Sequence, residues 1–254
     1  MEKFRFIDTV KKGLDGFSLL AYNEAILQNV ALGKSPPTFH LNRPAAAGVS
    51  VGYYQNVADE VDIAMCKKLG IIIGRRYYGG GAIYQENEIE YSICQAIGGH
   101  LSPVDVLTSY KLICEGVIQS LLILGINSTF KPVNDIIVGN KKISGNAQTR
   151  RNGVLFQEGT IILDVDVDKM FTVLKVPAEK VKQKHINDIK QCVTSVNQEL
   201  QKKISFEELS ATLRYGFATA CSLFLEEDTF NDDEEKYAER ARIVFSADTW
   251  TYKR

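Results

Sequence analysis

Residues 71–84 read Ile-Ile-Ile-Gly-Arg-Arg-Tyr-Tyr-Gly-Gly-Gly-Ala-Ile-Tyr, and they form the most unusual stretch of this chain. Three consecutive isoleucines predict a short buried strand, which runs directly into two arginines and three glycines. A guanidinium group suits carboxylate or phosphate oxygens, and consecutive glycines let backbone N–H groups approach a ligand closely. The stretch lacks the Gly-Lys-Ser/Thr of a Walker loop and the GxGxxG of a dinucleotide site. It therefore indicates either an anion site or a tight turn beside a surface arginine pair.

On both sides of this stretch, apolar periodicity and turn residues predict a mixture of strands and helices. Helices are expected over Phe17–Leu32, Asp59–Leu69, Pro103–Leu124 (opened by a capping Ser102), Asp168–Leu174, Phe206–Leu223 and Asp232–Phe245. Strands are expected over Met1–Asp8, a pair within Phe39–Gln55, Ile71–Ile73, Ile89–Ala96, Ile136–Val138, Lys142–Ala147, Val154–Phe156 and Thr160–Leu163. The Asn152-Gly153 dipeptide between two strands is a strong hairpin signal. The pattern predicts one α/β (α+β) domain over residues 1–254, with a mixed β-sheet core flanked by helices.

The composition excludes several classes of protein. The 254 residues carry 30 basic and 31 acidic side chains, which argues against nucleic acid as a partner. The N-terminus lacks the apolar region of a secretory signal, and no apolar run approaches the length of a membrane span. The five cysteines are widely spaced and never in a CxxC pair, so neither a disulfide framework nor a zinc site is indicated. We expect a soluble, cytoplasmic protein that contacts no membrane.

A second cluster of polar residues follows the longest predicted helix. Asn134-Asp135 precedes a predicted strand that reads Lys-Ile-Ser-Gly-Asn-Ala over residues 142–147. On a regular strand the side chains of Lys142 and Ser144 share one face, and Ile143 points to the other. A lysine beside a glycine can meet an anion as a point charge, and Asp135 can hold Mg²⁺ or pair with Lys142. The alternative is a hairpin with exposed lysines.

Together, and in this order, the two segments resemble the lipoate–protein ligase family from about Leu19 to Ser246. The resemblance implies a biotin/lipoate ligase-like catalytic domain, without the C-terminal accessory domain that many members carry. It also implies that ATP and lipoic acid give lipoyl-adenylate, whose acyl group then moves to a lysine of a lipoyl carrier domain. Glycine-cleavage H protein and 2-oxoacid dehydrogenase subunits are the expected carriers, and a separate accessory-domain protein is a further expected partner.

The resemblance also assigns roles to residues. Lys142 would contact both the lipoyl carbonyl and the α-phosphate, and Asp135 would place Mg²⁺ or orient Lys142. With Lys142, the residues expected to bind ATP are Arg76, Gly80, Gly81, Ala82, Ile83, Tyr84 and Asn134. With Lys142, the residues expected to bind lipoate are Val51, Tyr53, Tyr78 and Gly79. The apolar slot that Val51, Tyr53 and Tyr78 would line is inferred from strand alternation.

Three positions depart from the family pattern. Tyr78 stands where a small hydroxyl residue is common, Gln85 and Glu158 stand where histidine is common, and His40, His100 and His185 lie at no motif position. Two alternatives therefore stay open. One is an octanoyl or lipoyl transferase of the same fold that uses a cysteine thioester, for which Cys192 is the thiol to test because residues 128–135 contain none. The other is a weakened paralogue that binds acyl groups or a carrier without turnover.

Overall fold

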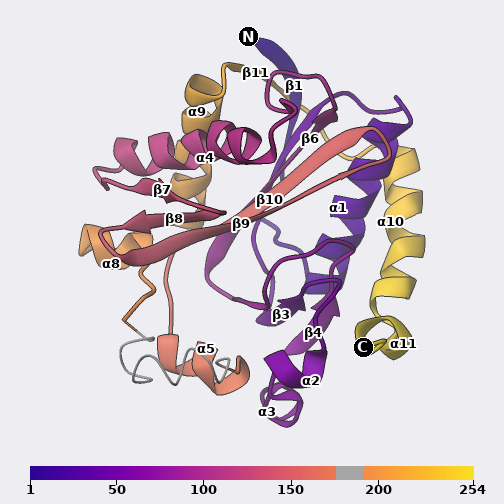
Figure 1. Ribbon diagram of the computed structural model, residues 1–254, viewed down its shortest axis with the longest axis vertical. Helices are drawn as coiled ribbons and strands as arrows, with labels where there is room; N and C mark the ends of the chain where they lie inside the picture. Colours follow the sequence, from indigo (N-terminus) through magenta and orange to yellow (C-terminus); the bar gives the residue numbers. More distant parts are fainter. Residues whose placement is uncertain (176–190) are drawn as a thin grey trace.

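The computed structural model describes residues 1–175 and 191–254 (Figure 1). Its main element is a mixed sheet of eight strands in the order β11-β1-β2-β6-β10-β9-β8-β7, in which β1 runs parallel to both its neighbours and the other pairs are antiparallel. The strands are β1 Glu2–Asp8, β2 Thr38–Asn42, β6 Glu88–Ala96, β7 Thr129–Lys131, β8 Asp135–Val138, β9 Lys141–Arg151, β10 Val154–Ile162 and β11 Leu223–Glu227. The predicted mixed sheet is thus confirmed.

A second, smaller sheet has the order β4-β3-β5 and lies beside one end of the large sheet (Figure 1). Its strands are β3 Gly48–Val51, β4 Ile72–Arg75 and β5 Ile83–Gln85. The two strands expected within Phe39–Gln55 exist, but β2 belongs to the large sheet and β3 to the small one. The connection from β4 to β5 carries the glycine-rich stretch, so the small sheet anchors both ends of that loop.

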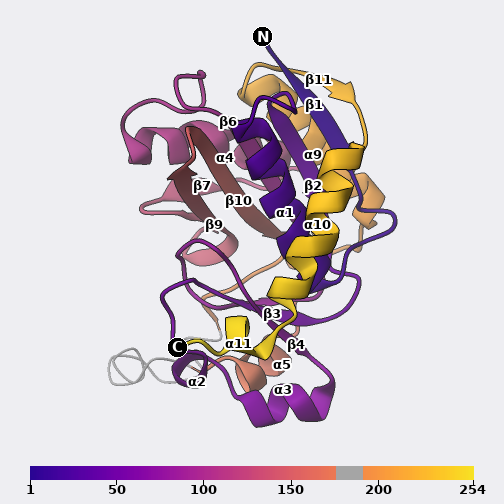
Figure 2. The ribbon, with the colours of Figure 1, turned by 90° about the vertical axis from the view of Figure 1, so that its right-hand side faces the viewer.

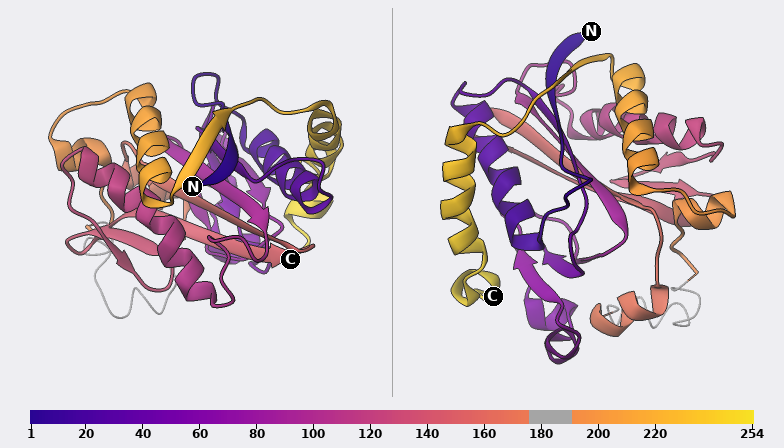
Figure 3. Two further views of the ribbon diagram at one scale, coloured as in Figure 1. Left: turned by 90° about the horizontal axis from the view of Figure 1, so that it is seen from above. Right: turned by 180° about the vertical axis from the view of Figure 1, so that it is seen from behind.

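Two pairs of helices cover the two faces of the large sheet (Figures 2 and 3). Helix α1 packs against α10 on one face, and α4 packs against α9 on the other. The helices are α1 Gly16–Ala31, α2 Val57–Glu60, α3 Ile63–Leu69, α4 Val106–Ile123, α5 Val167–Val173, α8 Val196–Leu200, α9 Phe206–Ala220, α10 Asp232–Phe245 and α11 Asp248–Thr251.

Helix α4 begins later than its sequence suggests. Its N-cap is Asp105, whose carboxylate accepts a hydrogen bond from the N–H of Thr108, whereas the predicted cap Ser102 bonds to Gln95 and to the preceding turn instead. By length and composition alone, α4 is apolar enough to cross a membrane. Its buried residues pack against α9 and the sheet, which is the arrangement of a core helix.

Three strands escaped prediction: β5, β7 and β11, of which β11 is the longest. The segment expected to be the end of a helix over Phe206–Leu223 contains the end of α9 and the start of β11, which pairs with β1 in parallel. β11 is an edge strand, and Phe224 and Glu226 are exposed on it. Because it is short and covered on one side only, its residues show no helix-breaking or strand-like pattern strong enough to reveal it.

Candidate active site

Lys142 lies where β9 bends. Asp135 pairs with Gly145 and Ile136 with Ser144, but Ile137 pairs with Lys142, so Ile143 is an extra residue, a β-bulge. Bulges re-aim side chains, often beside active sites. Here the bulge leaves Ser144 in the core and turns Lys142 towards Asp135. The prediction that Lys142 and Ser144 share a face is therefore wrong, because it assumed a regular strand.

An ion pair fixes the lysine in this position. Lys142 Nζ lies 2.6 Å from Asp135 Oδ1, and both side chains are about one-third exposed. The lysine side chain lies directly over Gly145, because a Cβ built on that glycine would come within 2.5 Å of Lys142 Nζ. Gly145 therefore provides the space that Lys142 occupies, and Asp135 holds the ammonium group at that spot.

This ammonium group faces a cavity of about 110 Å³ between the glycine-rich loop and the β9–β10 hairpin. The lining residues expected from the sequence are Arg76, Gly80, Gly81, Ala82, Ile83, Asn134 and Lys142. The lining residues that the sequence reasoning did not assign to a site are Gly145, Asn146, Ala147, Glu158, Gly159 and Thr160. Strand pairing could have revealed the second group, because β10 is joined to β9 by the predicted hairpin.

Arg76 holds the glycine-rich loop in place. Its guanidinium donates to the carbonyl oxygens of Ser50, at 2.8 Å, and Gly81, at 2.9 Å. The loop also approaches the backbone after β3 so closely that a Cβ on Gly52 would lie 2.1 Å from the carbonyl oxygen of Gly80. Gly80 itself has a φ of +104°, which side-chain-bearing residues rarely adopt. Gly52 and Gly80 thus allow the close backbone packing and the turn, and Arg76 maintains the shape of the cavity wall.

Arg75 has a separate structural role. It is fully buried, and its Nη1 atom donates to the carbonyl oxygens of Gly52, Tyr53 and Gln55. Its Nε atom donates to the carbonyl oxygen of Thr251 at 2.9 Å. Arg75 therefore ties the turn after β3 to the C-terminal helix α11, and contributes no charge to the cavity lining.

Asn134 and Asn146 clamp the start of β8 to β9. The Asn146 side chain donates to the carbonyl oxygen of Asn134 at 2.9 Å, and the Asn134 side chain donates to the carbonyl oxygen of Asn146. Tyr91 donates its hydroxyl proton to Asn146 Oδ1 at 2.6 Å. Both amides are thus engaged in positioning the strand that carries Lys142.

Three carboxyl groups are buried beside the cavity. Glu88 and Glu90 come from β6 and Glu158 from β10, and none is more than 8% exposed. Burial raises the pKa of Glu88 to about 8 and the pKa of Glu90 well above its usual value, with the neighbouring carboxylates adding to the shift. Burial also raises the pKa of Glu158, against the opposing charge of Arg76. Gln85 donates to Glu90, so two of the departures from the family pattern, Gln85 and Glu158, belong to one buried cluster.

Five residues predicted to contact ligands lie outside the cavity lining. Val51 is buried in the core of the small sheet, and Tyr78 packs against Phe156. Tyr53 contacts Trp250 and Lys253 near the C-terminus. Gly79 accepts a long hydrogen bond from Arg76, and the Tyr84 hydroxyl donates to Glu86 at 3.0 Å. The structure therefore does not bring Val51, Tyr53, Gly79, Tyr78 and Tyr84 together with Lys142 in this cavity.

The residues present do not fit a magnesium ion. The Asp135 carboxylate, the predicted ligand, is engaged by Lys142. Among residues 1–175 and 191–254 there is no group of three or more histidine, cysteine, aspartate or glutamate side chains that could hold a metal ion. Of the two roles predicted for Asp135, the geometry supports the orientation of Lys142.

None of the five thiols and neither of the two described histidines is among the residues that line the cavity. Burial raises the pKa of Cys66 to about 11, of Cys114 and Cys221 to about 12, and of Cys94 further still. Cys192 is half-buried, and its carbonyl oxygen accepts a hydrogen bond from the Lys142 N–H at 2.7 Å.

His40 is buried with its pKa lowered to about 3, chiefly by burial, and His100 contacts Glu2 near the N-terminus. His185 lies outside the described residues. Neither described histidine offers a base at the cavity that holds Lys142.

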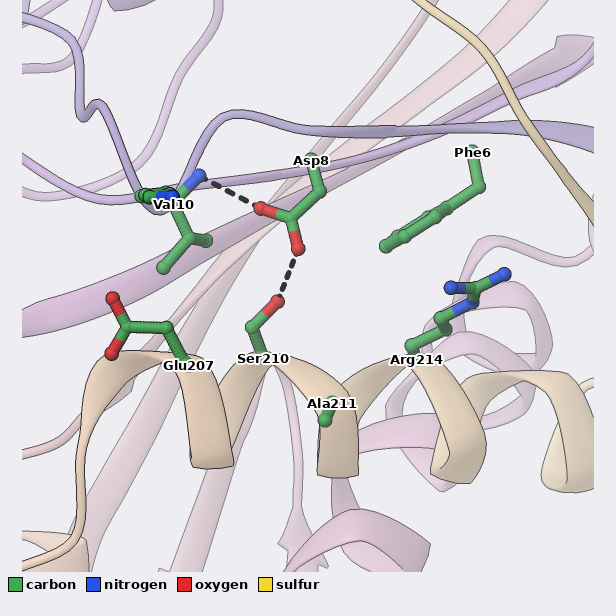
Figure 4. Close-up of a pocket in the computed structure, with 8 residues that line it drawn as sticks. Phe6, Asp8, Val10, Glu207, Ser210, Ala211 and Arg214 are labelled. Atoms are coloured by element: carbon green, nitrogen blue, oxygen red, sulfur yellow. Dashed lines mark hydrogen bonds between the residues drawn. The ribbon is translucent and has the colours of Figure 1, made fainter.

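A larger cavity, of about 280 Å³, lies between the end of β1 and helix α9 (Figure 4). Its central carboxylate, Asp8, accepts hydrogen bonds from Ser210 Oγ at 2.6 Å and from the Val10 N–H at 2.8 Å. Arg214 at its edge pairs with Glu227. Because Asp8 is engaged by Ser210 and Arg214 by Glu227, size does not make this cavity the active site, and we assign the chemistry to the cavity at Lys142.

Several known proteins resemble this chain over its full length. Octanoyltransferase LipM of Brevibacillus brevis is 30% identical over 100% of both chains, and octanoyltransferase LipM of Bacillus subtilis is 28% identical over 100% of this chain and 99% of its own. A chain in the structure of a bi-partite lipoate protein ligase and its E2 lipoyl domain from Thermoplasma acidophilum matches with a TM-score of 0.87 and 28% identity. That match covers 99% of this chain and 97% of the other.

These relatives correct the predicted activity. The interpretation as an ATP-dependent ligase that forms an acyl-adenylate is wrong, because octanoyltransferases align over the whole chain at 27–30% identity. The transferase alternative is favoured instead. ATP and Mg²⁺ lose their support with the ligase interpretation, whereas a substrate related to lipoate still fits.

The family itself follows from a more general comparison. The sequence model described as the lipoyl protein ligase A/B catalytic domain matches residues 15–218, which include the glycine-rich loop, the bulged strand β9 and every residue of the cavity. The chain therefore belongs to the lipoyl protein ligase A/B catalytic-domain family, as its two motifs predicted.

Proposed function

We propose that this protein is an octanoyltransferase that moves an octanoyl group from a thioester donor to a lysine ε-amine on a lipoyl carrier domain. The octanoyltransferases that match over the whole chain support the acyl group. The Thermoplasma structure, which is that of a bi-partite lipoate protein ligase and its E2 lipoyl domain, supports the acceptor. Glycine-cleavage H protein and the acyltransferase subunits of 2-oxoacid dehydrogenases are the carriers to test.

The observation that carries this proposal is the Lys142–Asp135 ion pair at the mouth of the cavity. Attack of an amine on a thioester carbonyl makes a tetrahedral oxyanion, and a fixed positive charge stabilises that oxyanion. Lys142 is held by Asp135 and seated over Gly145, so its ammonium group is positioned before substrate binds. An ammonium group that needs no reorganisation during the reaction is worth more than a mobile one.

The rest of the cavity suits an acyl chain beside a polar reaction centre. Ala82, Ile83 and Ala147 give its wall apolar side chains, which can contact the carbons next to the thioester. Arg76 is engaged with carbonyl oxygens of β3 and of the loop, so it maintains the wall rather than competing for the oxyanion. Lys142 is thus the cation assigned to the reacting carbonyl.

An assay of the purified chain tests the proposal. Octanoyl-coenzyme A serves as the thioester probe and an isolated lipoyl domain as acceptor, without ATP, and intact-mass spectrometry measures octanoylation of the domain. We expect Lys142→Ala to lower kcat by about 10²–10³-fold, the usual cost of removing one oxyanion-stabilising group. The matched control is Lys141→Ala, because Lys141 is the exposed neighbour on the same strand.

The outcomes separate the open alternatives. Transfer by the wild-type chain that needs Lys142 but not Lys141 supports the proposal. Failure of the wild-type chain to octanoylate any carrier would contradict it, and binding of the lipoyl domain without turnover would favour the weakened paralogue. Running the assay on this chain alone also tests whether a separate accessory-domain protein is required.

A further inference from the structure

The cavity at Lys142 is lined by two cationic side chains, those of Lys142 and Arg76, and by one carboxyl group, but by no thiol. All five cysteines of the chain lie within the described residues, and none lines this cavity. Four of them are buried with raised pKa values, which disfavours the nucleophilic thiolate. The carboxyl group is that of Glu158.

Strand pairing directs Glu158 into the cavity. On β10, Glu158 pairs with Ala147 and Thr160 pairs with Gly145, and all four residues line the cavity from one face of the sheet. The intervening residue of β10, Gly159, allows the close approach of Tyr91 and Asn146 from the other strands, because a Cβ there would lie 2.1 Å from Asn146 Oδ1. The position of Glu158 is thus set by the strands that also position Lys142.

Two side chains fix its carboxyl group. Glu158 Oε2 accepts a hydrogen bond from Asn23 Nδ2 at 3.1 Å, and Oε1 lies 3.8 Å from Arg76 Nε. Asn23 belongs to α1, and Arg76 follows β4, so the carboxyl group is held from two sides. With 8% of its surface exposed, Glu158 is buried from bulk water yet borders the cavity.

The charges around Glu158 tune its proton affinity. Burial raises its pKa, and the Arg76 guanidinium limits the rise. A carboxyl group whose pKa is raised is a stronger base when ionised, and catalytic bases are most effective with a pKa near the working pH. The titratable and charged groups that act on this cluster are Glu88 and Glu90 from β6, Lys142 from β9, and Arg76 and Tyr78 from the segment after β4.

We propose that Glu158 is the catalytic base of this protein, and that the acyl group passes from the donor thioester directly to the acceptor lysine, without an acyl-cysteine intermediate. This inference rests on the proposed octanoyltransferase function. The acceptor ε-amine arrives neutral, having released one proton to solvent. Its nitrogen bonds to the thioester carbonyl carbon, the ionised Glu158 takes a proton from that nitrogen, and Lys142 stabilises the oxyanion.

The second half of the step restores the enzyme. The oxyanion re-forms the carbonyl, the carbon–sulfur bond breaks, and the electron pair leaves on sulfur. Glu158 then returns its proton to the thiolate and is ionised again. The products are an octanoyl-lysine amide and the free thiol of the donor, with no oxidant, reductant or nucleotide consumed.

The test compares Glu158→Gln with Cys192→Ser in the octanoyl-coenzyme A assay. Glutamine keeps the shape and the hydrogen bond to Asn23 but cannot accept the proton. We expect kcat to fall about 10²-fold or more in Glu158→Gln, within the usual range for general base catalysis, with KM little changed. We expect Cys192→Ser to retain wild-type activity, and intact-mass spectrometry of the wild-type protein with octanoyl-coenzyme A alone to show no octanoyl adduct.

A third variant distinguishes catalysis from structure. Glu158→His places a different base at the same point, so it should recover part of the lost activity and shift the acidic limb of the kcat–pH profile. Glu158→Gln should abolish that limb. A purely structural role would leave the limb of each variant at the wild-type position.

The possible failures are distinguishable. Wild-type activity in Glu158→Gln, or an octanoyl adduct on Cys192 together with inactivity of Cys192→Ser, would overturn this inference while leaving the transferase function in place. Absence of octanoyl transfer by the wild-type chain would instead overturn the proposed function. Thermal unfolding of each variant verifies that a loss of activity is not a loss of fold.

Discussion

Strand β6 separates two buried environments of opposite character. Ile89, Tyr91 and Ile93 face α4 and α9, are at most 1% exposed, and belong to a continuous apolar core. Glu88 and Glu90 alternate with them, face the other side of the same sheet, and are only 5% and 4% exposed. One strand thus buries hydrocarbon on one face and carboxyl groups on the other.

The apolar face of β6 stabilises the fold, whereas its carboxyl-bearing face lies on the side of the chemistry. Burial of apolar side chains is favourable at any pH, at about 1.5–3 kcal/mol for each large side chain. Burial of a carboxyl group is unfavourable unless the group is paired, hydrogen-bonded or protonated. The charged face lies beside the cavity of Lys142, and functional sites are where proteins keep such locally unfavourable groups.

The largest effect of removing a buried charge is expected for Glu234→Ala, on helix α10. Glu234 is fully buried and pairs with buried Arg5 through two hydrogen bonds, one of them 2.9 Å between Arg5 Nη1 and Glu234 Oε2. Its loss leaves the buried charge of Arg5 with only the half-exposed Asp228, at 3.9 Å, as an acidic partner, so we expect a destabilisation of about 3–5 kcal/mol. Urea unfolding at pH 7 measures it. A loss below about 1 kcal/mol would show that water reaches Arg5.

The next effect is a dependence of stability on pH that Glu88→Gln should weaken. In the folded protein the pKa of Glu88 is raised to about 8, so its carboxyl group keeps a proton that the unfolded chain releases near pH 4.5. The unfolded state binds fewer protons between these values, so stability falls as pH rises from about 4.5 to 8. The slope for one such group is at most about 1.4 kcal/mol per pH unit.

Chemical denaturation at a series of pH values checks this prediction. Glutamine cannot ionise, so the variant should lose part of the slope and should be more stable than the wild type at pH 8. Equal slopes in the two proteins would mean that Glu88 is ionised in the folded state. Glu90, whose pKa is also raised by burial, acts in the same direction and accounts for the remaining slope.

On the apolar face, Ile93→Val should have a smaller effect that does not change with pH. Ile93 is fully buried in the core shared with α4 and α9. Removal of one methyl group costs about 0.5–1.5 kcal/mol through lost burial and a small cavity. The urea midpoint should shift by the same amount at pH 5 and at pH 8. A shift that grows with pH would mean that this face is coupled to the carboxyl cluster.

The smallest effect is expected for Asp233→Ala, next to Glu234 on α10. Asp233 pairs with Lys34 at 2.7 Å, but both side chains are more than half exposed. Exposed ion pairs contribute little to stability, and salt screens them. Unfolding in low and high salt should show the smallest loss of this series, and that loss should shrink with added salt. A loss as large as that of Glu234→Ala would remove the distinction between buried and exposed charge on this helix.

Sequence patterns predicted some features of the site and not others. Arg76, Asn134 and Lys142 were predicted to share one site, and the structure brings all three to one cavity. The face of Lys142 was not predictable from alternation, because the bulge at Ile143 changes the register of β9. Glu158 was noticed only as a departure from a family pattern. Its place beside Lys142 depends on the pairing of β10 with β9.

Local sequence signals likewise predicted only part of the fold. Helix α10 was predicted with its observed bounds, because the acidic start and the basic finish at Arg240 and Arg242 are local signals. The β9–β10 hairpin was predicted from Asn152-Gly153, where both residues have positive φ as such a turn requires. The edge strand β11 was missed, because it is defined by its pairing with β1, more than two hundred residues away.

The class of fold, the turns and the two family motifs were predictable from the sequence, because periodicity, glycine conformation and capping act between near neighbours in the chain. Three features became visible only in the packed protein: Arg76 shapes the cavity while Arg75 ties down α11, Lys142 turns towards Asp135, and carboxyl groups from β6 and β10 are buried together. Those outcomes depend on strand register and burial between distant segments, and the electrostatic environment of a side chain exists only once those segments have packed.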